Sequence, residues 1–207
     1  MRNTLLIVGC LLIGGLIGAG SWFVPQPAPT APTAPISLTD YVQNVPNVQI
    51  SYYDIYAVES AAIRTELNKK RPFNDGDAHT NWHYSWRWDG GPNGECGTKS
   101  AQVTFSGLVT LPRLANASKI SSATAADWSR YMSALIRHEA GHLSQAYNAQ
   151  HSLIEAIRNA DCATANSAGE EAVKAMRRQD IEFDRRTNHR MRNGAVFPQP
   201  RWAWLFS

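Results

Sequence analysis

The sequence has little excess of either charge and lacks the features of a nucleic-acid-binding protein. Its formal net charge is only +3 over 207 residues, and it has no lysine-rich run, no nucleic-acid-binding motif and no internal repeat. We therefore expect no nucleic-acid partner and no repeat architecture. With 43% hydrophobic and 18% charged residues, the chain can bury one ordinary core, which predicts a single globular domain.

The N-terminal segment is predicted to carry the chain out of the cytoplasm. Residues 4–24 form an apolar run behind Arg2, long enough to cross a bilayer and also compatible with an export signal. We interpret residues 1–24 as a signal peptide or transmembrane anchor, and residues 25–36, which are rich in proline, as an extended linker. The domain at 37–207 is then periplasmic or on the cell surface, anchored in the inner membrane by residues 4–24 if they are not cleaved, or secreted if they are.

Segments typical of strands precede segments typical of helices, which predicts an α+β fold with a small antiparallel sheet. The expected strands are 48–58, a segment within 79–88, and 101–111, which Pro112 should close; the expected helices are 59–70, a long one from about 122 to 160, and 170–187. In the second strand, Trp82, Tyr84, Trp86 and Trp88 alternate with polar residues. This aromatic face is expected to pack under the long helix, and a stacking platform for a carbohydrate or peptide is the alternative.

The motif His138-Glu139-Ala140-Gly141-His142 lies in the middle of the long amphipathic helix. Because residues four apart share a helix face, His138 and His142 can bind one metal ion. Glu139 points to an adjacent face, where its carboxylate can take a proton from a water at the metal. The pattern therefore predicts a Zn²⁺ site with Glu139 as the catalytic base. Two surface histidines at helical spacing are the alternative interpretation.

A third zinc ligand must come from another element, because Gln145 and Asn148 stand where the short metzincin motif has glycine and histidine. From His142 the helix advances about 27 Å to Ala160 at ~1.5 Å per residue. If the next helix returns antiparallel, an equal number of residues ends near 184–190. This window contains Asp184 and His189. We prefer His189 as the ligand, with Asp184 orienting a histidine; Asp184 as the ligand is the alternative. The weaker candidates are Glu182, Glu170 and Glu171.

Cysteine is scarce, and only Cys96 and Cys162 lie outside the apolar leader. In an oxidising compartment, an even pair favours a disulfide, and two unpaired thiols are the alternative. A bond between them would attach the turn between the two helices to the sheet.

The order of these motifs resembles a bacterial family catalogued as domain of unknown function 922. The resemblance rests on YYDIYAVESAAIRTEL, AHTNWHYSWRW, HEAGH, the two cysteines and FDRRTNH, and covers roughly residues 45–194; the family usually has glycine where Arg190 stands. The family is regarded as predicted secreted zinc-dependent proteases, so the resemblance implies a zincin-like peptidase acting on a protein or peptide substrate.

Two other functions fit parts of the sequence. A non-catalytic envelope module could bind cell-wall polymers through the aromatic strand and the arginines at 177, 178, 185, 186, 190 and 192. A zinc amidase acting on peptidoglycan would use the same metal site on a different bond.

Overall fold

The computed structural model describes residues 37–73, 76–90, 96–188, 192 and 194–198, all within one compact unit. The predicted leader and proline-rich linker lie outside these residues. Within the described ranges, no helix combines the length and apolar character needed to cross a membrane.

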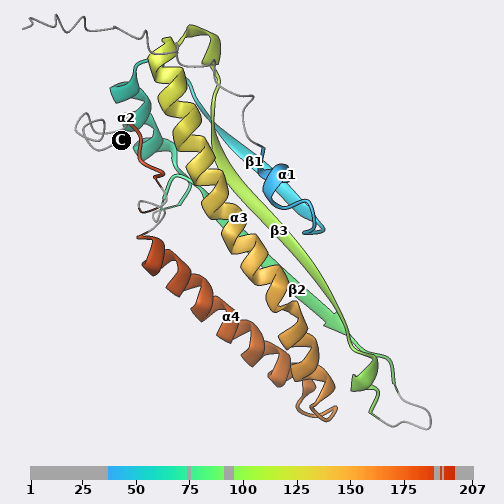
Figure 1. Ribbon diagram of the computed structural model, residues 1–207. Coiled ribbons are helices and arrows are strands. Elements are labelled where there is room, and N and C mark those ends of the chain that lie inside the picture. Colours follow the sequence, from blue (N-terminus) through green and yellow to red (C-terminus); the bar gives the residue numbers. More distant parts are fainter. Residues whose placement is uncertain (1–36, 74–75, 91–95, 189–191, 193, 199–207) are drawn as a thin grey trace, which may run out of the picture. The chain divides into compact units, whose positions relative to one another are not determined.

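The described chain has the α+β order expected from its sequence (Figure 1). Its elements are α1 (Leu38–Tyr41), β1 (Val48–Ile55), α2 (Ser60–Lys70), β2 (His79–Arg87), the short 3-10 turn η2 (Thr98–Ser100), β3 (Gln102–Leu114), a second turn η3 (Ala117–Lys119), α3 (Ser122–Arg158) and α4 (Ala165–Thr187).

The sheet is mixed, which corrects the predicted antiparallel arrangement. Its strand order is β1-β3-β2, with β2 antiparallel and β1 parallel to the central β3. The chain reverses direction between β1 and β2, where α2 intervenes, and again between β2 and β3. The third strand therefore runs in the same direction as the first, and it pairs with β1 because it inserts between the two earlier strands.

Strand β3 continues past Pro112, although we expected this proline to end it. The first residue of β2, His79, pairs with Thr110, so beyond that point only β1 is paired with β3. A proline lacks an N–H donor and is tolerated where one side of a strand is unpaired. Pro112 meets this condition.

Helix α3 is the longest element, and α4 folds back beside it (Figure 1). Ser121 caps α3 by accepting a hydrogen bond from the Thr124 N–H. The turn to α4 is shorter than expected because the Asp161 carboxylate accepts hydrogen bonds from the N–H and hydroxyl of Thr164, so that α4 already begins at Ala165. The helical hairpin that the length argument assumed is thus formed.

The aromatic face of β2 is part of the core. Trp82 and Tyr84 are buried, and the Tyr84 hydroxyl donates a hydrogen bond to the Ala146 carbonyl of α3. Trp86 packs against the core and donates from its indole N–H to Asn166 at the start of α4. The packing interpretation is confirmed, and burial withdraws Trp82 and Tyr84 from any stacking platform.

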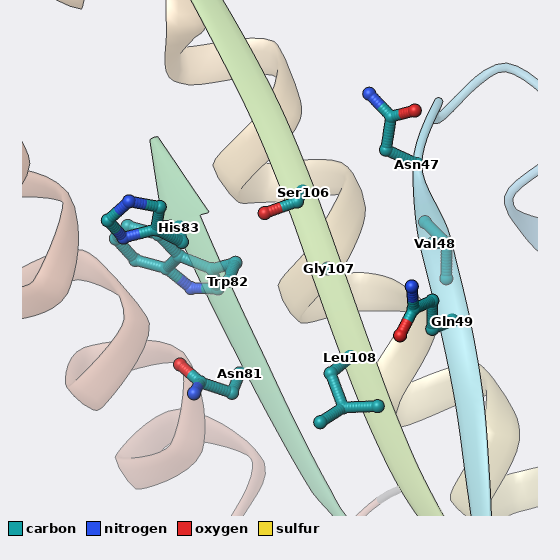
Figure 2. Close-up of a pocket in the computed structure, with 9 residues that line it drawn as sticks. All are labelled: Asn47, Val48, Gln49, Asn81, Trp82, His83, Ser106, Gly107 and Leu108. Carbon is teal, nitrogen blue, oxygen red and sulfur yellow. The ribbon is translucent and has the colours of Figure 1, made fainter. Parts of the chain in front are cut away.

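The opposite face of the sheet carries a shallow polar pocket of about 350 Å³ (Figure 2). Gly107 faces α3, since a Cβ there would meet Leu143, so its neighbours Ser106 and Leu108 point to the other face. The other polar lining residues are Asn81 and His83 from β2, Gln49 from β1 and Asn47, which precedes β1. This pocket and the helical hairpin therefore lie on opposite faces of the sheet.

The predicted disulfide between Cys96 and Cys162 is confirmed. It joins the segment before β3 to the turn between α3 and α4. The Thr98 hydroxyl adds a hydrogen bond to the Ala160 carbonyl at the same place. These links attach the turn of the helical hairpin to the end of the sheet, so they restrict where α4 can run.

Candidate metal centre

The two histidines of the motif converge on one point between α3 and α4. The Nε2 atoms of His138 and His142 lie 3.0 Å apart, and the two rings meet edge to face. Both side chains are buried, at 1% and 5% exposed. Two imidazole nitrogens directed at one point inside a protein are a suitable pair of ligands for a transition metal ion.

Asp184 of α4 completes a group of three ligand atoms. Its Oδ1 lies 3.0 Å from Nε2 of His138 and 3.3 Å from Nε2 of His142. The three atoms fall within 4.8 Å of one another, so the group could hold a metal ion. The hairpin therefore brings the candidate that we ranked second to the histidine pair. His189, the candidate we preferred, lies outside the described residues, and its role stays a prediction.

Asp180 was missed by the sequence analysis, although it contacts the site directly. Its Oδ1 lies 2.7 Å from Nδ1 of His142. A carboxylate at Nδ1 fixes the ring and leaves Nε2 directed toward the ligand group. Asp180 thus occupies the orienting position that we had assigned to Asp184. A signal for it was present, because Asp180 and Asp184 repeat the four-residue spacing of the two histidines on a returning helix.

Phe183 explains why a glycine lies inside the motif. Its ring contacts both imidazoles, with centroids 5.1 Å from His138 and 4.8 Å from His142. A Cβ at Gly141 would come within 2.8 Å of this ring. Gly141 therefore allows α4 to approach α3 closely enough for Asp180 and Asp184 to reach the imidazoles.

Glu139 is buried on the side of α3 that faces β2. Its side chain is 2% exposed, and its Oε2 accepts a 2.8 Å hydrogen bond from the hydroxyl of Thr80. The other acidic candidates are elsewhere: Glu182 pairs with Arg185, while Glu170 and Glu171 are exposed on the first turns of α4. The site therefore has the carboxylate of Glu139 on α3, next to the histidine pair, and the carboxylates of Asp180 and Asp184 on α4, opposite that pair.

A family comparison matches residues 50–190 of this chain, which include every residue of the site described above. The chain belongs to the DUF922 family. The family is described as bacterial proteins of unknown function, so membership supplies no activity. No curated protein and no solved structure matches the chain. The chemistry of this DUF922 protein must therefore be inferred from its own residues.

Close contacts between the acidic and imidazole groups of the site strongly shift the pKa values of His142 and Asp184. Burial by itself lowers the pKa of His142, but hydrogen bonds to Asp180 and Asp184 outweigh it and raise this pKa from 6.5 to about 10. Burial would raise the pKa of Asp184, but hydrogen bonds from His138 and His142 hold it well below its usual range. At neutral pH, His142 therefore carries a proton at the place where a metal ion would bind. Either the protonated imidazole or a bound metal ion offsets the negative charge of Asp180 and Asp184.

Binding of a divalent metal ion at pH 8 is expected to release the proton of His142. Held between Asp180 and Asp184, this imidazole has a pKa of about 10, so the ring is protonated at pH 8, whereas a metal ligand must be neutral. The affinity for the ion should consequently rise with pH up to about 10. Calorimetry in two buffers of different ionisation enthalpy counts the released protons. The variant Asp180→Asn should release fewer, because it lacks the largest hydrogen-bonding cause of the raised pKa; equal proton release by both proteins would contradict this electrostatic description.

Proposed function

We propose that this DUF922 protein is a zinc-dependent peptidase that hydrolyses peptide bonds outside the cytoplasm. The observation that carries the proposal is the convergence of His138, His142 and Asp184, with the buried carboxylate of Glu139 on the adjacent side of the same helix. Two imidazoles, one carboxylate and a neighbouring glutamate are the set of groups that hydrolytic zinc sites use.

The residues present fit zinc better than a hard cation. Two of the three ligand atoms are imidazole nitrogens, whereas calcium and magnesium prefer oxygen ligands. Three protein ligands also leave a coordination position for water or substrate, as in catalytic zinc sites. We therefore propose His138, His142 and Asp184 as the zinc ligands.

In the proposed mechanism, Glu139 is the general base. When bound, a zinc ion would polarise the scissile carbonyl and lower the pKa of the attacking water. Glu139 takes the proton of that water and passes it to the leaving nitrogen. Asp180 keeps the His142 ring directed at the ion, and Phe183 covers the imidazoles on the α4 side. Burial of Glu139 and both histidines excludes bulk water from around these groups.

The disulfide is consistent with a site of action outside the cytoplasm, because such bonds persist in oxidising compartments. Within that setting we propose a periplasmic or cell-surface enzyme, held at the inner membrane if residues 4–24 remain attached.

The structure reduces the support for the rival hypothesis of a wall-polymer-binding module. That hypothesis used the aromatic strand and the arginines. Trp82 and Tyr84 are buried, while Arg177 lies over the Trp82 ring and donates to the Trp82 carbonyl, and Arg185 pairs with Glu182. The hydrogen bond from Arg177 also occupies the Trp82 carbonyl of β2.

Removal and return of the metal tests the proposed function. The purified full-length protein should hydrolyse fluorescently labelled, unfolded casein, lose this activity when zinc is chelated, and regain it with one equivalent of zinc. Peptidoglycan, assayed in parallel, decides between a peptidase and an amidase. Hydrolysis that persists after all metal has been removed would contradict the proposal, as would a zinc-loaded protein that cleaves neither substrate.

A further inference from the structure

We infer that Thr80 of β2 is a positioning residue for Glu139, so that the base and the metal ligands are held by two different elements. This inference rests on the proposed function, because it concerns the step in which Glu139 moves a proton.

The contact between Thr80 and Glu139 is short and buried. The Thr80 hydroxyl lies 2.8 Å from Oε2 of Glu139 and 3.3 Å from the main-chain carbonyl of the same residue. Thr80 is 7% exposed and Glu139 2% exposed. A buried carboxylate is costly unless it is hydrogen-bonded, so this hydroxyl favours one placement of the Glu139 side chain over others.

The backbone that carries Thr80 is well fixed. Thr80 pairs with Val109 of the central strand β3. Three residues earlier in the chain, Asp77 accepts two hydrogen bonds from Arg64 of α2 and one from Tyr131 of α3. Threonine is also restricted at χ1 because it is β-branched. The hydroxyl is therefore presented to Glu139 from a rigid strand.

The metal ligands receive their support from a different element. Asp180, Phe183 and Asp184, which contact the two imidazoles, all belong to α4. Among the contacts named here, the element common to both sets is α3, which carries the motif itself. Loss of the Thr80 hydroxyl should therefore affect proton transfer while leaving the ligand group intact.

The variant Thr80→Val tests this separation, since it removes the hydroxyl and preserves the shape of the side chain. Hydrolysis of labelled casein by the full-length, zinc-loaded protein should show kcat lowered roughly 10- to 100-fold, with KM and zinc affinity unchanged. Thr80→Ser should recover most of the loss. The matched control is Thr124→Val, which removes another buried threonine hydroxyl, bonded to the hydroxyls of Ser60 and Ser121 at the start of α3 and far along the helix from Glu139, and it should leave kcat unchanged.

A double variant distinguishes positioning from a general structural role. If Thr80 acts through Glu139, adding Thr80→Val to Glu139→Gln should not slow the residual reaction further. A further drop in the double variant would overturn the inference, and so would an unchanged kcat or a loss of zinc in Thr80→Val alone. If the proposed function itself is wrong, the result differs from all of these, because the zinc-loaded protein without any substitution would then hydrolyse nothing.

Discussion

Replacement of Glu139 by glutamine is expected to lower kcat for peptide hydrolysis roughly 100- to 10,000-fold, which is the range that a general base contributes. The amide has nearly the shape of the carboxylate and can still accept the Thr80 hydrogen bond, but it cannot take the proton of the attacking water. Glu139 is not one of the three proposed ligands, so the variant should still bind one zinc ion with little change in affinity. Steady-state kinetics measure kcat, and a zinc titration of the same protein measures the affinity for the ion.

Glu182→Gln serves as the control for Glu139→Gln. Glu182 lies on α4 two residues from Asp184, but its carboxylate is partly exposed and pairs with Arg185 and Arg186. Its loss should leave kcat within about twofold, in keeping with the small effect of exposed ion pairs. If Glu139→Gln retains full activity with zinc bound, Glu139 is not the base and the proposed mechanism fails.

Replacement of Asp184 by alanine is expected to weaken zinc binding by more than the roughly 10- to 100-fold that loss of an orienting carboxylate costs. The substitution removes one of three proposed ligands and also leaves two buried imidazoles without the carboxylate that now contacts both. Competition with a chromophoric chelator measures the affinity. Hydrolysis should fall in parallel and return partly at high zinc concentration.

His189→Ala is the decisive companion to Asp184→Ala. If Asp184 is the third ligand, His189→Ala should bind zinc nearly as well as the unsubstituted protein. A larger loss of zinc affinity in His189→Ala than in Asp184→Ala would instead show that His189 is the third ligand, as we preferred from the sequence. Asp184 would then orient a histidine. Asp180→Asn should lie between these extremes, because Asp180 contacts His142 at the nitrogen that faces away from the ligand group.

Those parts of the structure that depend on local sequence were predictable. The spacing of His138 and His142 required only that α3 be a helix, and the long helix expected from about 122 to 160 is observed at Ser122–Arg158. The length argument assumed that α4 returns antiparallel, and on that condition the rise per residue of a helix correctly selected the window that contains Asp184. The pairing of Cys96 with Cys162 followed because the sequence offers no other cysteine outside the leader.

The features that depend on contacts between distant elements were not predictable in the same way. Whether Asp184 or Asp180 faces the ligand atoms depends on the rotation of α4 about its axis, which Phe183 and Gly141 set by packing. The role of Thr80 depends on β2 lying beside α3 at Glu139, a placement that no spacing in the sequence specifies. The parallel pairing of β1 with β3 likewise required knowing that the last strand inserts between the first two.

We propose above all that α3 and α4 together bind one metal ion through His138, His142 and Asp184. X-ray absorption at the zinc edge tests it most directly, because imidazole rings give a distinct scattering signature. We expect one zinc ion per chain, bound by two imidazoles and further oxygen ligands with no thiolate, and the loss of this spectrum in His138→Ala. A protein that binds no zinc, or a zinc shell without the paired imidazoles, would contradict binding by His138, His142 and Asp184.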